Sequence, residues 1–521
     1  MFIRKNTSHL ATRLVTALLT AATPLLLASC SWVTDDYDID EPSEPAANYI
    51  NFSLTVRGGE ADAATRAPLG GEYGDGREAA FERENLVSGI TVILYQSTTG
   101  LSDIAAKVDF IKFFPVTRWR LDDQGTTTYG KDRTNPDNAQ THNDGVYAEC
   151  VYTTGDQKLE QGALDFTKSY HVLIVANQNL ANAFPKGTPI SEVREATYNN
   201  VYANYSPGDP TTAQNFVITT ENDAVINFNA MTPTPKTIDD IQAYLYSVTQ
   251  PLYIERMAAR IDFHTTGGTY VELPEGAENP TVKGYQYGVS GGGKFVITDV
   301  VPFNLYNGEE YLFKRVCADW ASRTPTVSYL ADETTDNYVV DPKTATKLAD
   351  NTPEYYVSTL AADMSDSHYK QNMATAKAKT AQTYKLSSSD NIIIAYPKEN
   401  TLLPTSPLKK YATGLAFIGK FYAIGSTTAE DRTYYTYLRH QGEGNESYKA
   451  WQWNELGDDW TQQEYGPAPT TGSYTAGPAM NFGIVRNNIY RVSVESITDE
   501  GIKLLIKVKH WDRFEHTPIY M

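Results

Sequence analysis

The stretch INFSLTV at residues 50–56 shows the pattern that decides the fold class of this chain. Its apolar side chains alternate strictly with polar ones, and they are Ile50, Phe52, Leu54 and Val56. Because successive side chains of a strand point to opposite faces, this alternation predicts a β-strand with one buried face. A glycine-rich stretch of small and polar residues follows and ends in TRAPLGG at residues 65–71. It predicts an exposed loop directly after the strand.

Short segments rich in Val, Ile, Tyr and Phe recur along the chain, with turn residues between them. We predict further strands at 89–95, 146–152, 170–177, 253–264, 294–301, 392–396, 416–423, 434–439, 489–494 and 501–511. Residues 121–145 and 441–479 read as long loops. Many short strands and few helices predict an all-β chain made of β-sandwich domains, with a domain boundary near residue 253.

Two short helices are predicted between these strands. The first has Ser191 as its N-cap, acidic residues in its first turn, and Val193, Ala196 and Val201 on its apolar side. The second covers residues 238–244 after a cap at Thr237.

The beginning of the chain has the features of an export signal. Arg4, Lys5 and Arg13 accompany an apolar stretch at residues 14–28, which is shorter than the ~20 residues needed to cross a bilayer. A basic start and a short apolar segment predict a secretory signal peptide over residues 1–29. The small residues before Cys30 resemble a bacterial lipobox, which predicts that a lipid is attached to this thiol. The acidic residues after it, 31–48, predict a flexible tether.

The charge and the cysteine content narrow the classes of function. The chain of 521 residues has a formal net charge of −19, which argues against binding to nucleic acid or to anionic lipid. Three cysteines are too few for a disulfide scaffold. With Cys30 assigned to the lipid, Cys150 and Cys317 remain, and the sequence leaves open whether they pair.

The sequence points to no enzymatic site. It has no P-loop, no dinucleotide fingerprint and no HExxH motif, and its eight histidines are not grouped at metal-ligand spacing. We therefore predict no catalytic, cofactor-binding or metal-binding residue. A secreted enzyme is the weakest alternative, since no residue set can be named for it. A glycan-binding lipoprotein would use Trp451, Trp453 and Trp460, although these residues also suit the interior of a sheet or loop cluster.

Two features indicate assembly. The Arg66–Ala67 bond in the exposed loop suits an arginine-specific protease, although an ordinary surface arginine is an equal alternative from the residues alone. The second feature is an alternating strand near the C-terminus, with Ile502, Leu504, Ile506 and Val508 followed by Trp511 and Phe514. The simpler interpretation of this segment is the last strand of its own domain.

Together, these two features suggest a subunit that polymerises by strand exchange. If the first strand leaves after cleavage, its sheet gains an apolar groove with unpaired backbone groups, which invites another chain to pair there. A strand donated by a second subunit would fill this groove. Because donor and acceptor surfaces differ, such head-to-tail contacts can continue into a filament.

Several longer stretches resemble the fimbrillins of Bacteroidales, the shaft subunits of type V pili, and most closely the major subunit of the short (minor) fimbria. They are LLASC at 26–30, TRAP at 65–68, YHVLIVANQNLANAF at 170–184, ERMAARIDF at 255–263, YYTYLRH at 434–440 and FGIVRNNIYRVSVESITDEG at 482–501. The last stretch is the most specific, and the resemblance runs over nearly the whole chain.

This resemblance implies a lipoprotein precursor that an arginine-specific protease cuts between Arg66 and Ala67. It implies a lipidated propeptide at 30–66 that is removed, and two transthyretin-like, Greek-key β-sandwich domains in tandem, at 67–252 and 253–521. The C-terminal region, about Ile502–Met521, is the implied donor.

The resemblance also implies partners and a location. The partners are other copies of the chain, accessory and anchor subunits, the protease, and receptors on host or bacterial surfaces. The precursor is expected at the outer membrane and the mature chain in a fimbria on the cell surface, where it supports adhesion and biofilm formation. Anchor and tip subunits share the fold, so an uncleaved subunit of that kind is the alternative.

Overall fold

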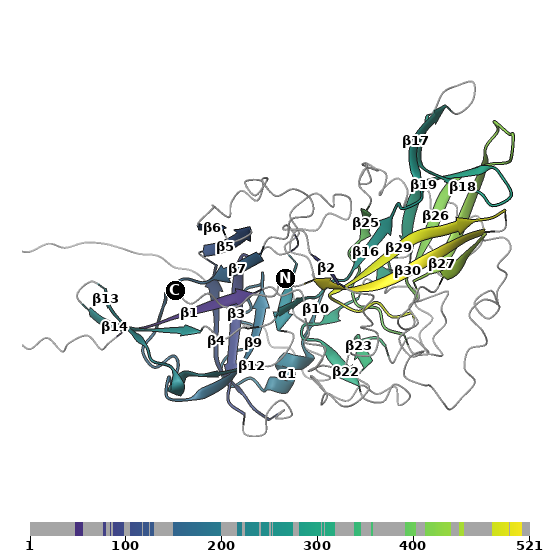
Figure 1. Ribbon diagram of the computed structural model, residues 1–521. Coiled ribbons are helices and arrows are strands. Elements are labelled where there is room, and N and C mark those ends of the chain that lie inside the picture. The colour runs from purple at the N-terminus through teal and green to yellow at the C-terminus, as the bar shows by residue number, and fades with distance from the viewer. Residues whose placement is uncertain are drawn as a thin grey trace, which may run out of the picture.

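The computed structural model shows two lobes that consist almost entirely of strands (Figure 1). It describes residues 47–55, 77–79, 84, 87–97, 105–116, 118–123, 126–129, 149–199, 216–220, 224–238, 241–248, 252, 254–274, 281–303, 305–306, 308–317, 338–344, 356–357, 391–402, 412–438, 447–452, 482–499 and 501–512. The predicted all-β class is confirmed. In this part of the chain, no helix is long and apolar enough to cross a membrane.

The N-terminal lobe is a sandwich of two sheets. The first sheet has the order β13 (Thr234–Ile238), β14 (Ile241–Val248), β1 (Ala47–Thr55), β7 (Glu149–Thr153), β5 (Arg118–Asp123) and β6 (Thr126–Tyr129), and β8 (Gln157–Leu159) also pairs with β1. The second has the order β15 (Ile254–Arg256), β11 (Ile218–Thr220), β9 (Ser169–Ala176), β3 (Gly89–Tyr95) and β4 (Val108–Pro115), and β12 (Ala224–Asn227) also pairs with β9. A core that includes Phe52, Val92 and Ile174 lies between the two sheets.

The second sheet of this lobe is covered on both faces. Ile93 and Val175 point to the outer face, where they pack with Ile190 and Val193 of the helix α1 (Ile190–Glu195). Every residue of β3 is therefore buried, which explains its continuous apolar sequence GITVILY. A short 3₁₀ helix, η4 (Phe228–Ala230), follows β12.

The C-terminal lobe is a single large sheet that folds around its own core (Figure 1). Its order is β17 (Thr269–Pro274), β18 (Thr281–Gly288), β19 (Lys294–Phe303), β26 (Gly414–Tyr422), β27 (Glu430–Tyr437), β28 (Ser447–Gln452), β30 (Gly501–Asp512), β29 (Asn488–Ile497), β16 (Arg260–His264) and β25 (Asn391–Ala395). The short strand β2 (Arg77–Ala79) pairs with the end of β30. Three two-stranded pairs complete the described strands: β10 (Thr197–Tyr198) with β21 (Glu310–Tyr311), β20 (Leu305–Tyr306) with β24 (Tyr356–Val357), and β22 (Arg315–Cys317) with β23 (Tyr338–Val340).

The chain passes from one lobe to the other at residues 257–259. The predicted strand at 253–264 is in fact two strands, β15 in the N-terminal lobe and β16 in the C-terminal lobe. The three residues between them are fully buried, and each belongs to a different apolar core: Met257, Ala258 and Ala259. The change of sheet thus occurs a few residues after the predicted boundary.

Both helix predictions need correction. The first helix begins at Ile190 with Pro189 as its N-cap, without a side-chain cap from Ser191, and it ends at Glu195 because the next residues extend toward β10. The second predicted helix, 238–244, is wrong. Its residues belong to the hairpin of β13 and β14, in which Ile238 pairs with Ile241. The aromatic and β-branched residues of IQAYLYSV favour a strand over a helix in this sheet.

The two predicted loops contain strands as well. β5 and β6 pair with each other at the start of the region 121–145, and β28 lies within 441–479 between β27 and β30. The strand β6 has the polar sequence TTTY, and the part of β5 within the predicted loop ends in two aspartates, so the sequence pattern did not mark them as strands.

Candidate functional site

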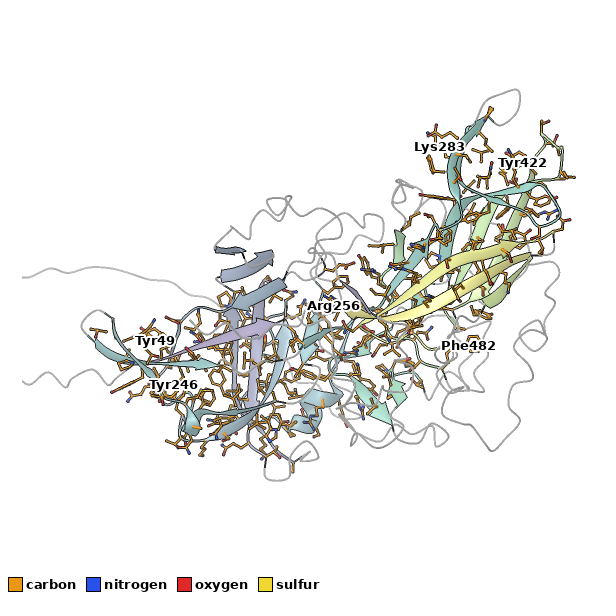
Figure 2. All side chains as sticks on the ribbon, in the orientation of Figure 1. Tyr49, Tyr246, Arg256, Lys283, Tyr422 and Phe482 are labelled. Atoms are coloured by element: carbon orange, nitrogen blue, oxygen red, sulfur yellow. The ribbon has the colours of Figure 1, made fainter. Side chains whose placement is uncertain are left out.

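The strand β1 lies inside its sheet and not at an edge. It pairs in parallel with β14 on one side and antiparallel with β7 and β8 on the other. Tyr49 of β1 and Tyr246 of β14 are labelled in Figure 2 on these neighbouring strands. Removal of β1 would therefore split the sheet and leave two unpaired strand edges facing each other.

Two side chains of β1 fill the core of the N-terminal lobe. Ile50 and Phe52 are both fully buried, as their alternation predicts. The Phe52 ring lies 5.3 Å from the ring of Phe114, measured between centroids. Burial of each side chain contributes about 1.5–3 kcal/mol to stability. These residues are the anchors that any strand in this position must replace.

The turn at residues 154–156, between β7 and β8, binds the centre of β1 at the point where the partner of β1 changes from β8 to β7. The backbone N–H of Phe52 donates to the hydroxyl Oγ1 of Thr154 at 3.1 Å, and the N–H of Thr154 donates to the carbonyl of Phe52 at 3.1 Å. The next residue, Gly155, has a φ of 64°, in the left-handed region that glycine adopts without strain. This turn places the side chain of Asp156 beside Asn51, whose amide donates to Oδ1 at 3.0 Å.

The remaining residues of the predicted propeptide are placed only in part. Leu54 belongs to β1 and pairs with Tyr152 through the backbone, but its side chain lies outside the described residues. Val56, the lipidation residue Cys30 and the cleavage residues Arg66 and Ala67 also lie outside them. Their roles stay predictions.

The predicted donor residues occupy the core of their own lobe in this monomer. Ile502, Leu504, Ile506 and Val508 are buried, and their strand β30 lies between β28 and β29. Trp511 is near the end of β30, opposite Glu78 of β2, and Phe514 lies outside the described residues. This placement is the one expected of a last strand in its own domain. A donor role for these four residues requires β30 to leave its sheet.

Elsewhere, the described residues do not form a metal site or the nucleophile elbow of a serine hydrolase. They contain no group of three or more His, Cys, Asp or Glu side chains that could hold a metal ion. The stretch GVSGG at 288–292 has the GxSxG spacing of serine hydrolases, but it joins β18 to β19 in a hairpin, where a nucleophile elbow would join a strand to a helix.

Trp451 lies in β28, and Trp453 and Trp460 lie outside the described residues. The strands that carry Cys150 and Cys317 are described, but the two side chains are not.

A buried ionic network joins the two lobes, and the sequence analysis missed it. Arg260 donates to Glu84 at 2.9 Å and to both carboxylate oxygens of Asp262 at 2.9 and 3.0 Å. Tyr396 donates to the other oxygen of Glu84 at 2.5 Å. Burial opposes the charge of Arg260, but Asp262 and Glu84 outweigh it and keep the pKa of Arg260 above its usual range. Glu84 lies on the N-terminal side of β3, so this network fixes the chain just beyond the predicted cleavage loop.

The guanidinium of Arg256 extends this network at the junction. Its Nε donates to the backbone carbonyl of Glu84 at 3.0 Å, and Nη1 donates to Asn487 at 3.1 Å. Figure 2 labels Arg256 between the two lobes. Both arginines come from the stretch ERMAARIDF, where charged residues interrupt an apolar segment. That interruption was the available signal, because an arginine in a buried segment needs a partner.

A second buried cluster contains two carboxylates, Glu310 and Glu399, with Arg486. Arg486 donates to Glu399 at 2.7 Å, and the backbone N–H of Glu399 donates to Glu310. Burial raises the pKa of Glu310 to about 8, with Arg486 opposing the rise and Glu399 adding to it. Burial therefore favours the protonated form of Glu310 in the folded chain.

We expect Glu310→Gln to flatten the pH dependence of stability. The pKa of Glu310 in the unfolded chain is the ordinary one of 4.5, whereas burial raises its pKa in the folded chain to about 8, so its contribution to stability falls as pH rises between these values. The glutamine variant cannot ionise and should be more stable than the parent at pH 8. Urea unfolding midpoints measured from pH 5 to 8 would test this, with the exposed Glu272→Gln as control. A parent and a Glu310→Gln variant with parallel pH profiles would contradict it.

Comparison with known proteins gives structural similarity at low identity. No protein-family model matches the chain, and no curated protein matches it. Among solved structures, a candidate cell adhesion protein from Parabacteroides distasonis has 13% identity and a TM-score of 0.37, with 90% of this chain and 100% of that chain covered. A fimbrilin (FimA) from Porphyromonas gingivalis has 13% identity and a TM-score of 0.35, covering 90% and 99%. The tip fimbrial protein Mfa3 from the same organism, with a C-terminal truncation, has 11% identity and a TM-score of 0.33, covering 88% and 100%.

The chain is similar to fimbrial proteins of Bacteroidales. They are of the same group that the sequence resembles.

Proposed function

We propose that this chain is a structural shaft subunit of a cell-surface fimbria, which matures by proteolysis and polymerises by strand exchange. The observation that supports the proposal most directly is the position of β1. This strand is central in its sheet and contributes Ile50 and Phe52 to the core, yet it precedes the predicted cleavage bond at Arg66. A protease that cuts there would convert a covalent part of the core into a separable segment.

The proposed maturation begins with export of a lipoprotein that carries its lipid on Cys30. Cleavage between Arg66 and Ala67 then separates the lipid, the tether and β1 from the rest of the chain. When β1 leaves, it vacates the core positions of Ile50 and Phe52. It also exposes the backbone edges of β14, β7 and β8. An extended segment of a second copy would restore both the apolar burial and the backbone hydrogen bonds.

The donor is proposed to lie in the C-terminal region, residues 502–521. Since β30 is held between β28 and β29, the use of Ile502–Val508 as donor requires that sheet to open. The proposed partners are other copies, accessory and anchor subunits and an arginine-specific protease, and the proposed site of assembly is the outer membrane. The fimbria would serve adhesion and biofilm formation.

Phe52→Ala is expected to destabilise the precursor but not the assembled fibre. In the precursor the change leaves a cavity beside Phe114 and should lower the free energy of unfolding by about 3–5 kcal/mol. In a fibre whose subunits have lost β1, residue 52 is absent and the change has no effect. Thermal unfolding of precursor and fibre would measure this, with Val225→Ala on an exposed face as control. Equal destabilisation of both forms would show that β1 is retained.

Analysis of surface material from cells tests the maturation itself. The proposal requires protein whose N-terminal residue is Ala67 and which forms ladders that resist mild denaturant. Surface protein that keeps the lipid on Cys30 and stays monomeric would rule out the shaft role and favour an anchor or tip subunit.

A further inference from the structure

The face of β1 that points away from the core carries a polar contact that joins the strands on its two sides. Asn51 lies on this face, since Ile50 and Phe52 on either side of it point into the core. The amide of Asn51 donates to Oδ1 of Asp156, and Oδ2 of Asp156 forms an ion pair with Lys236. Asp156 directly precedes β8 and Lys236 belongs to β13, so the ion pair connects opposite sides of β1.

This contact covers the outer face of β1 at Asn51. The inner face is covered by the core, and the two edges are covered by β14 and by β7 with β8. The side chains of Lys236 and Asp156 are about one-third exposed, at 30% and 33%. A strand that leaves or enters this place through the outer face must therefore separate Lys236 from Asp156.

The contact also depends on side-chain identity, unlike the backbone ladder around it. Backbone pairing accepts any extended segment, and the apolar places of Ile50 and Phe52 still permit a shift of register by two residues. An ionised carboxylate only accepts hydrogen bonds, so the residue opposite Asp156 must donate one. An acidic residue there would face Asp156 with a like charge and leave the hydrogen bond unmade.

We propose that Asp156 determines which strand can occupy the place of β1 and in which register, while its ion pair with Lys236 closes the outer face over that strand. The preferred occupant is an extended segment in which an amide or a cation stands between two bulky apolar residues. This rests on the proposed function, in which the occupant after cleavage is a segment of a second copy. Within the proposed donor region, Ile502–Lys503–Leu504 and Ile506–Lys507–Val508 have this pattern.

Synthetic peptides of residues 47–56 test the selectivity, first against the unaltered acceptor and then against one variant of it. The acceptor is the precursor after arginine-specific cleavage and removal of the N-terminal fragment. We expect the parent peptide and its Asn51→Lys form to bind, and the Asn51→Asp form to bind about tenfold more weakly, from the loss of one hydrogen bond to a charged group. Asp156→Lys in the acceptor should reverse the order of the lysine and aspartate peptides, which a general loss of stability would not do.

The results separate this inference from the proposed function. If the three peptides bind the unaltered acceptor equally, Asp156 does not select the strand and the inference is wrong, while strand exchange stands. If the parent peptide does not bind at all, strand exchange at this place is wrong and the inference falls with it.

Release of the cleaved fragment tests the closing role. Lys236→Met should speed the dissociation of residues 30–66 several-fold at low ionic strength, because the ion pair that spans β1 is then lost. Added salt should speed release from the unaltered protein and have little effect on the variant, since a partly exposed ion pair is screened. Lys283→Met is the matched control, because it removes an exposed ion pair with Glu272 between β18 and β17 of the C-terminal lobe. Equal release rates for Lys236→Met and the parent would overturn the closing role.

Discussion

Deletion of residues 502–521 is expected to unfold the C-terminal lobe and yield no folded monomer. The deletion removes β30, which pairs with β28, β29 and β2 and whose Ile502, Leu504, Ile506 and Val508 are buried in the core. Each buried side chain contributes about 1.5–3 kcal/mol, and the sum approaches the 5–15 kcal/mol by which a domain is usually stable. Circular dichroism and limited proteolysis would show the loss of structure.

A shorter deletion is the matched control for this experiment. Removal of residues 513–521 leaves β30 whole, since the strand ends at Asp512. This variant should keep the folded lobe, so its ability to polymerise can be measured without interference from unfolding. A folded monomer after deletion of 502–521 would contradict the structural role of β30 in the C-terminal lobe.

Arg260→Met is expected to lower the free energy of unfolding by about 3–5 kcal/mol. The side chains of Arg260, Glu84 and Asp262 have no exposed surface, so the change removes the buried cation that pairs with Glu84 and one of the two cations, with Arg491, that pair with Asp262. Urea unfolding with a fluorescence readout would measure the loss. Lys283→Met, whose ion pair with Glu272 is about half exposed, should cost no more than about 1 kcal/mol.

A second change should recover part of this loss. Glu84→Gln removes the buried carboxylate charge that paired with Arg260, so the double variant Arg260→Met with Glu84→Gln should be more stable than Arg260→Met alone. Additive destabilisation by the two changes would show that Glu84 and Arg260 are not energetically coupled, contrary to their 2.9 Å contact.

Local pattern in the sequence predicted the strands whose apolar residues alternate or cluster. Ile50 and Phe52 of β1 and the apolar face of β30 follow it directly, because each buries one face against a core. Residues 238–244 of the hairpin at 234–248 were wrongly predicted as a helix. A short apolar segment with mixed spacing fits the period of a helix as well as that of a strand. Its strand character comes from the sheet, where Ala243 and Leu245 pack with Tyr49 from a strand almost two hundred positions earlier in the chain.

The sequence predicted the apolar residues of the candidate site but not its polar contacts. The places of Ile50 and Phe52 follow from alternation, but Asp156 and Lys236 have no local feature that marks them as contacts of Asn51. The same holds for the network at the junction, in which Glu84 is 176 positions from Arg260 and 312 from Tyr396. Pairings over such separations depend on the whole topology, and a single sequence does not show them.

The two strands on either side of the cleavage loop are held by different lobes. β1 ends against β7 in the N-terminal lobe, whereas β2 begins against β30 in the C-terminal lobe. While the chain is intact, the covalent connection makes the return of β1 to its place an intramolecular event with a high effective concentration. After a cut between the two strands, β2 stays with the C-terminal lobe, and rebinding of β1 depends on its bulk concentration. Dilution of the free fragment would then make strand loss effectively one-way and give each subunit a defined direction of assembly.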